Sequence, residues 1–80
     1  MNGLRLYIKP ISANGVVGKK VFYSRRAGGP YYRWFFEEKL GRWQGLRMHA
    51  CDLTLGELSL ACWKAVPLAL QVRLNEHYME

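Results

Sequence analysis

Acidic residues are almost missing from the first half of this sequence. Residues 1–36 hold seven lysines and arginines and no aspartate or glutamate. Residues 1–50 hold ten cations against two acids, a balance of +8, whereas residues 51–80 hold two cations against four acids, a balance of −2. This asymmetry favours a basic surface that binds a polyanion, and a generic solubilising surface is the alternative explanation.

Long apolar runs are missing as well. The longest candidate, residues 65–72, has eight residues and includes a proline and a glutamine, so it is too short to span a bilayer. The first residues, MNGLRLYIKPI, lack a basic start followed by an apolar stretch of signal-peptide length, and we therefore expect a cytoplasmic protein. The two cysteines are then expected to be free thiols rather than a bridge.

Patterns typical of catalysis and metal binding are also missing. Glu37 and Glu38 are adjacent, so in a strand they lie on opposite faces and cannot share a proton. The glycines of GVVGKK at residues 15–20 lack the spacing of a phosphate-binding loop. Four potential zinc ligands do not show the usual spacing in two pairs: His49, Cys51, Cys62 and His77. We expect neither an enzyme nor a metal or cofactor.

Apolar and aromatic residues, by contrast, are plentiful. Half of the 80 residues are hydrophobic, and they include three tryptophans, five tyrosines and three phenylalanines. A chain of this length forms one domain and buries only ~60–65% of its unfolded surface. Some apolar area is therefore left for a partner, and a second copy of the chain, forming a homodimer, is the simplest one.

The first fifty residues predict strands, a basic β-meander that precedes a helical segment at 51–80. LRLYIK at residues 4–9 alternates apolar and polar residues, which is typical of a half-buried strand. Asn14-Gly15 predicts a hairpin turn before a second strand at 16–26, whose inward face the pattern leaves open. Further strands follow at 31–39 and 42–50, giving a four-stranded antiparallel meander.

The last thirty residues change to a helical pattern. Thr54 and Glu57 have the spacing of a capping box, which predicts a helix over 55–66. Pro67 then breaks or kinks the helix, and the apolar spacing of Leu70, Leu74 and Tyr78 predicts a second helical stretch. Residues 68–74 also alternate as a strand would, so a strand remains the alternative. The expected class is α+β, with the helical segment packed on one sheet face.

The two faces of the predicted sheet differ in character. An apolar floor for the helical segment consists of Leu4, Leu6, Ile8, Tyr32, Trp34, Phe36, Leu46 and Met48. The opposite face displays Arg5, Tyr7, Lys9, Tyr31, Arg33, Phe35, Trp43, Arg47 and His49. About half of the rings are thus expected in the core, and the others are expected among exposed cations.

Rings set among cations suit unpaired nucleic acid, because bases stack on the rings while cations contact phosphates. The element order resembles that of Pur-repeat and related single-stranded-DNA-binding coactivator domains and, more distantly, the three-strand-plus-helix DNA-binding domains of some integrases, without a shared sequence motif. We therefore expect single-stranded DNA or RNA to bind at Arg5, Tyr7, Lys9, Lys19, Lys20, Arg25, Arg26, Tyr31, Arg33, Phe35, Trp43 and Arg47. The alternative is a protein-interaction or self-assembly module whose exposed rings pack against another chain.

Overall fold

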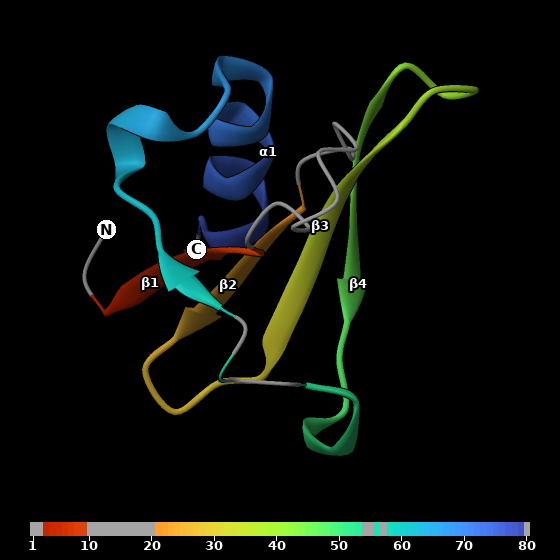
Figure 1. Ribbon diagram of the computed structural model, residues 1–80. Coiled ribbons are helices and arrows are strands. Elements are labelled where there is room, and N and C mark those ends of the chain that lie inside the picture. Colours follow the sequence, from red (N-terminus) through yellow and green to blue (C-terminus); the bar gives the residue numbers. More distant parts are fainter. Residues whose placement is uncertain (1–2, 10–20, 54–55, 57, 80) are drawn as a thin grey trace.

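The computed structural model describes residues 3–9, 21–53, 56 and 58–79. Its strands are β1 (Leu4–Ile8), β2 (Phe22–Arg26), β3 (Tyr31–Glu37), β4 (Arg42–Arg47) and β5 (Ser59–Leu60). Its helices are the 3-10 turns η1 (Ala50–Asp52) and η3 (Trp63–Ala65), and the α-helix α1 (Leu68–Tyr78). All five strands form one antiparallel sheet in the order β4-β3-β2-β1-β5 (Figure 1). The predicted α+β class is confirmed, but the sheet has five strands rather than four.

The alternating pattern of β1 and β3 sets the side of the sheet on which α1 packs. Leu6 and Trp34 are buried on this side, which we call the helix side, and Phe22 of β2 joins them. The buried core consists of Leu6, Phe22, Trp34, Trp43, Val66, Leu70 and Leu74. The prediction for β1 and β3 is therefore confirmed, and the open question for β2 is resolved in favour of Phe22.

Strand β4 presents the opposite face to the one that we predicted. Phe36 pairs with Trp43 across the β3–β4 ladder, so Trp43 points to the helix side, where it is only 8% exposed, while Leu46 is 52% exposed on the other side. The reason is space beside Trp34, whose register partner is Gly45. A Cβ at Gly45 would stand 2.6 Å from the Trp34 ring, so only glycine fits there. The expectations that Trp43 is displayed and that Leu46 lies in the core are both wrong.

The predicted helix over 55–66 is also wrong where the structure describes that segment. Residues 59–60 are the edge strand β5, which pairs with Tyr7 and Ile8, and residues 63–65 are the 3-10 turn η3. The apolar side chains of residues 59–66 do not share one environment, because Val66 is buried in the core while Leu60 is 72% exposed. The apolar face of a single helix would not give them such different exposures. The capping pair Thr54 and Glu57 lies outside the described residues.

The second helical stretch is confirmed as α1. Pro67 is its N-cap rather than its first helical residue, and its fixed φ of −54° precedes the first turn. Leu70 and Leu74 are fully buried against the sheet, and Tyr78 packs at the edge of the same core. The spacing of four residues thus places one face of α1 on the sheet, as predicted.

Candidate nucleic-acid interface

The sheet face that points away from α1 carries most of the predicted binding residues. By the register of the ladders, this open face holds Arg5, Tyr7, Lys9, Tyr23, Arg25, Tyr31, Arg33, Phe35, Glu37, Arg42, Gln44 and Leu46. Its position follows from strand alternation, because each of these residues is next to one that faces the helix side. Seven of the twelve were predicted as binding residues, and the structure brings them onto one face.

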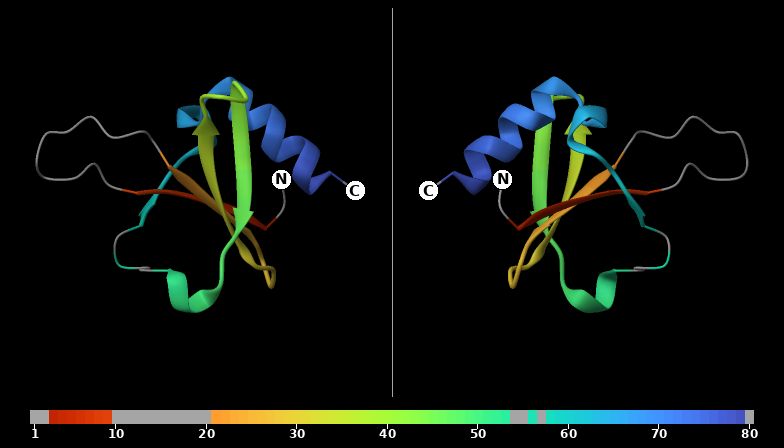
Figure 2. Two further views of the ribbon diagram at one scale, coloured as in Figure 1. Left: turned by 90° about the vertical axis from the view of Figure 1, so that its right-hand side faces the viewer. Right: turned by 90° about the vertical axis from the view of Figure 1, so that its left-hand side faces the viewer.

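The connection from β4 to β5 divides this open face. It runs from one edge of the sheet to the other, and η1 lies below β1 in Figure 2 while α1 lies above it. A hollow of about 140 Å³ between this connection and the sheet is lined by Lys9, Tyr23, Arg33, Met48, Asp52, Leu53 and Leu58. Tyr23 is therefore only 8% exposed although it faces away from α1. The prediction of a fully open face holds only for the parts beside this connection.

One uncovered part of the face forms a cluster of two rings and two arginines, Arg5, Tyr7, Arg25 and Tyr31, which we call the Tyr31 cluster. The Arg25 guanidinium lies over the Tyr31 ring, 5.2 Å from its centroid, and the Tyr7 and Tyr31 centroids are 6.1 Å apart. Arg25 also donates from Nε to the Gly29 carbonyl oxygen at 3.1 Å. Its guanidinium is therefore held in place before any ligand binds.

The two arginines of this cluster stand directly opposite each other on neighbouring strands, since Arg5 pairs with Arg25 in the β1–β2 register. Like charges in such a position destabilise a sheet. Arg5 is exposed and Arg25 is half-buried, so an anion bound between them would relieve the repulsion. This pair is the electrostatic feature of the open face that best fits a phosphate ligand.

A hollow of about 420 Å³ adjoins the Tyr31 cluster. It is lined by Arg25, Gly29, Pro30, Tyr31, Arg47, Met48 and His49. The Gly29-Pro30 turn and the end of β4 meet here, because the Met48 N–H donates to the Tyr31 carbonyl oxygen at 2.9 Å. No carboxylate is among the described lining residues. His49 was expected on the displayed face but was not among the predicted binding residues, and its position two residues beyond Arg47 was the available signal.

Three of the predicted binding residues lie elsewhere. Arg26 faces the helix side, where it donates to the Tyr78 carbonyl oxygen at 2.6 Å and lies 5.3 Å from the Tyr78 ring centroid. Trp43 is buried in the core, in edge-on contact with Phe22 at 5.9 Å. Arg47 pairs with Tyr32 in the β3–β4 register, so strand alternation puts it on the helix side, and the prediction that it is displayed beside Arg33 is wrong. Phe35 stays on the open face but lies toward the far end of β3, away from the Tyr31 cluster. Lys19 and Lys20 lie outside the described residues.

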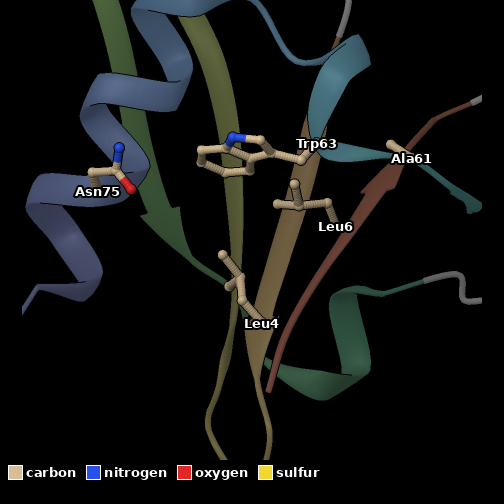
Figure 3. A pocket seen from close by; sticks show the side chains of 5 residues that line it. All are labelled: Leu4, Leu6, Ala61, Trp63 and Asn75. Atoms are coloured by element: carbon tan, nitrogen blue, oxygen red, sulfur yellow. The ribbon is translucent and has the colours of Figure 1, made fainter. Parts of the chain in front are cut away.

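A further hollow lies on the helix side of the sheet (Figure 3). It measures about 360 Å³ and is lined by Leu4, Leu6, Ala61, Trp63 and Asn75. Figure 3 shows the Trp63 indole between Leu6 and Asn75, with Leu4 below. Its described lining residues include no cation, so its chemistry differs from that of the hollow beside Tyr31.

Among the described residues, two titratable groups with clearly shifted pKa values, His77 and Tyr78, lie on the helix side. Burial lowers the pKa of His77 from its usual 6.5, and the nearby Arg73 and Arg26 act in the same direction. Burial raises the pKa of Tyr78 above its usual 10.0, and the hydrogen bond with Ser24 opposes this. Both shifts follow from the packing of α1 on the sheet rather than from chemistry on the open face.

Comparisons with known proteins leave the function to be argued from the site itself. No protein-family model, curated protein or solved structure gives a significant match to this chain. No helix in the described part of the chain is long and apolar enough to cross a membrane.

Proposed function

We propose that this protein binds nucleic acid, preferably as a single strand, at the Tyr31 cluster. The observation that carries the proposal is the Arg25 guanidinium held 5.2 Å above the Tyr31 ring, with the Tyr7 ring beside it. Exposed rings of this kind stack on unpaired bases, and guanidinium groups contact phosphates bidentately. Bases in a duplex are already stacked, so a single strand is the better ligand.

Salt dependence tests the electrostatic half of this proposal. Three cations lie in or next to the cluster, Arg5, Lys9 and Arg25, and we expect each of them to contact a phosphate. Binding of a single strand of about 12 nucleotides should then weaken with salt, with a slope of about −2 in a plot of log K against log salt. The measurement is the fluorescence anisotropy of a labelled oligonucleotide, and an affinity indifferent to salt would contradict the proposal.

Replacement of one ring tests the stacking half. Tyr31→Ala should weaken binding by about 5- to 150-fold, because one stacked base contributes ~1–3 kcal/mol. Tyr31 is outside the buried core, so the variant should keep the circular dichroism spectrum of the native protein. Trp63→Ala is the matched control, since this partly exposed ring lies on the helix side. Equal losses in both variants would show that the Tyr31 cluster is not the interface.

Tryptophan emission gives an independent check of which side of the sheet binds the nucleic acid. Trp34 and Trp43 are buried in the core, and Trp63 lies on the helix side. Binding at the Tyr31 cluster should therefore leave the tryptophan emission nearly unchanged. Strong quenching by a bound strand would place the ligand on the helix side instead.

The second candidate function is self-assembly, and the outer edge of β4 favours it. Strand β4 ends the sheet on one side, and a hollow of about 690 Å³ beside it is lined by Phe35, Glu37, Lys39, Leu40, Gln44, Gly45 and Leu46. Leu40 and Leu46 are 58% and 52% exposed there. Because hydrogen-bonded pairs alternate along an antiparallel ladder and Met48 N–H donates to Tyr31, the main-chain groups of Gly45 point outward. Two copies could pair antiparallel about Gly45 and form a homodimer.

Light scattering at two protein concentrations tests this second candidate. A dimer that dissociates in Leu46→Lys but persists with or without an oligonucleotide would favour self-assembly as the function, because a lysine at a sheet edge opposes pairing. A monomer at every concentration would exclude it.

A further inference from the structure

The hollow beside Tyr31 is lined by three residues whose side chains can donate hydrogen bonds, Arg25, Arg47 and His49. We propose that this hollow binds the terminal phosphate of a single-stranded nucleic acid. The inference rests on the function proposed above and specifies which part of the ligand occupies this site.

Arg25 is already oriented for such a ligand. Its Nε donates to the Gly29 carbonyl oxygen and its guanidinium plane is supported by Tyr31, so little conformational freedom remains to be lost on binding. Arginine has five N–H donors in a fixed fork, and the bond to Gly29 uses the single one on Nε. The terminal nitrogens of the fork are thus left to contact phosphate oxygens.

Two donors come to the same hollow from the end of β4. Arg47 and His49 are both exposed, and the bond from Met48 N–H to the Tyr31 carbonyl oxygen fixes this stretch beside β3. The hollow is therefore lined by Arg25 of β2, by His49 beyond the end of β4, and by Arg47, whose ladder position opposite Tyr32 belongs to the helix side. The described lining includes no carboxylate that would neutralise them.

The charge of a terminal phosphate matches this arrangement better than an internal phosphodiester does. A phosphomonoester carries about −1.5 to −2 charges near neutral pH and offers three acceptor oxygens, whereas a diester carries a single charge. The volume of about 420 Å³ is in the range of small-molecule sites, and Tyr31 on its wall offers a stacking surface to the terminal base. Ring and donors together suit a terminal nucleotide.

Competition binding tests the inference. Unlabelled single strands of about 12 nucleotides, identical except for a 5′-phosphate, a 3′-phosphate or hydroxyls at both ends, displace a labelled strand at constant ionic strength. One of the phosphorylated strands should compete about tenfold better than the hydroxyl-ended strand, which corresponds to ~1.4 kcal/mol. The end that shows the preference identifies the polarity of the bound strand.

A double variant separates this site from general charge effects. Arg47→Gln with His49→Gln should abolish the preference for a phosphorylated end, and both side chains are exposed, so folding should not change. Lys64→Gln removes an exposed charge in η3 and should leave the preference intact.

Three results would overturn the inference in distinguishable ways. Equal competition by all three strands would remove the terminal-phosphate site while leaving the proposed function standing. Competition by inorganic phosphate as strong as that by the phosphorylated strand would show that the hollow takes free phosphate. If none of the oligonucleotides binds, both the proposed function and this inference are contradicted.

Discussion

Ser24 is the position where the smallest change should have a large effect on stability. Its side chain is completely buried, and the Trp34 Nε1–H donates to its Oγ at 2.8 Å. The same Oγ lies 2.6 Å from the Tyr78 hydroxyl, which joins the centre of the sheet to the end of α1. Ser24→Ala would leave the indole N–H of a 1%-exposed tryptophan without an acceptor. A buried donor left unpaired costs about 1–3 kcal/mol, and the free energy of unfolding should fall by this amount.

Tyr78→Phe provides the comparison within the same network. Ser24 still accepts from Trp34 in this variant, so only one hydrogen bond at the half-buried end is lost, and the expected cost is about 0.5–1.5 kcal/mol. The double variant should cost less than the sum of the single variants, because both remove the bond between Ser24 and Tyr78. Urea unfolding followed by circular dichroism measures all three values.

Ser59→Ala in β5 is the matched control, since Ser59 is exposed and the change should stay within about 0.5 kcal/mol. If Ser24→Ala is no less stable than Ser59→Ala, the indole N–H is not buried against Ser24 and the reasoning fails. A loss smaller than that of Tyr78→Phe would equally contradict it.

Three further predictions concern packing, titration and charge. Gly45→Ala should cost about 1–3 kcal/mol in urea unfolding, because its Cβ would stand 2.6 Å from the Trp34 ring, whereas Gly56→Ala meets nothing within 4 Å and should change little. The pKa of Tyr78 is raised from 10.0 in the fold, so the unfolded chain releases this proton first. The stability advantage of the native protein over Tyr78→Phe should therefore be complete below about pH 10 and disappear as the pH rises through the folded pKa, and an advantage that grew with pH would contradict the assignment. Arg5→Gln should leave stability unchanged or raise it, because it removes the repulsion with Arg25, yet weaken oligonucleotide binding. A clear loss of stability in Arg5→Gln would show that the pair is not repulsive.

Local patterns were sufficient wherever neighbours in the sequence decide the structure. The alternation in β1 and β3 predicted the buried side of both strands, and the four-residue spacing of Leu70 and Leu74 predicted the face of α1. Both patterns show which side of a strand or helix is apolar, and the spacing of residues within that strand or helix alone determines this side. The pattern of β2 left its inward face open, so the position of Arg25 beside Tyr31 became clear only from the pairing of β2 with β3.

The wrong predictions concern segments whose structure depends on a strand that is distant in the sequence. Trp43 and Leu46 compete for the helix side of β4, and composition alone favoured Leu46. The deciding factor is the room that Trp34 requires over Gly45, which depends on the pairing of β3 with β4. Residues 59–60 likewise became a strand because the edge of β1 lay open to them, and no pattern within so short a segment indicates this.

The position of β5 has a consequence for the order in which the protein folds. Strands β1 to β4 pair with their neighbours in sequence, whereas β5 pairs with β1, some fifty residues earlier in the chain. Contacts between distant segments carry the larger loop-closure entropy, so we expect successive hairpins to form early and this pairing to close last. Until that late step, β1 presents an unpaired edge, and the nascent chain is then most exposed to pairing with another molecule.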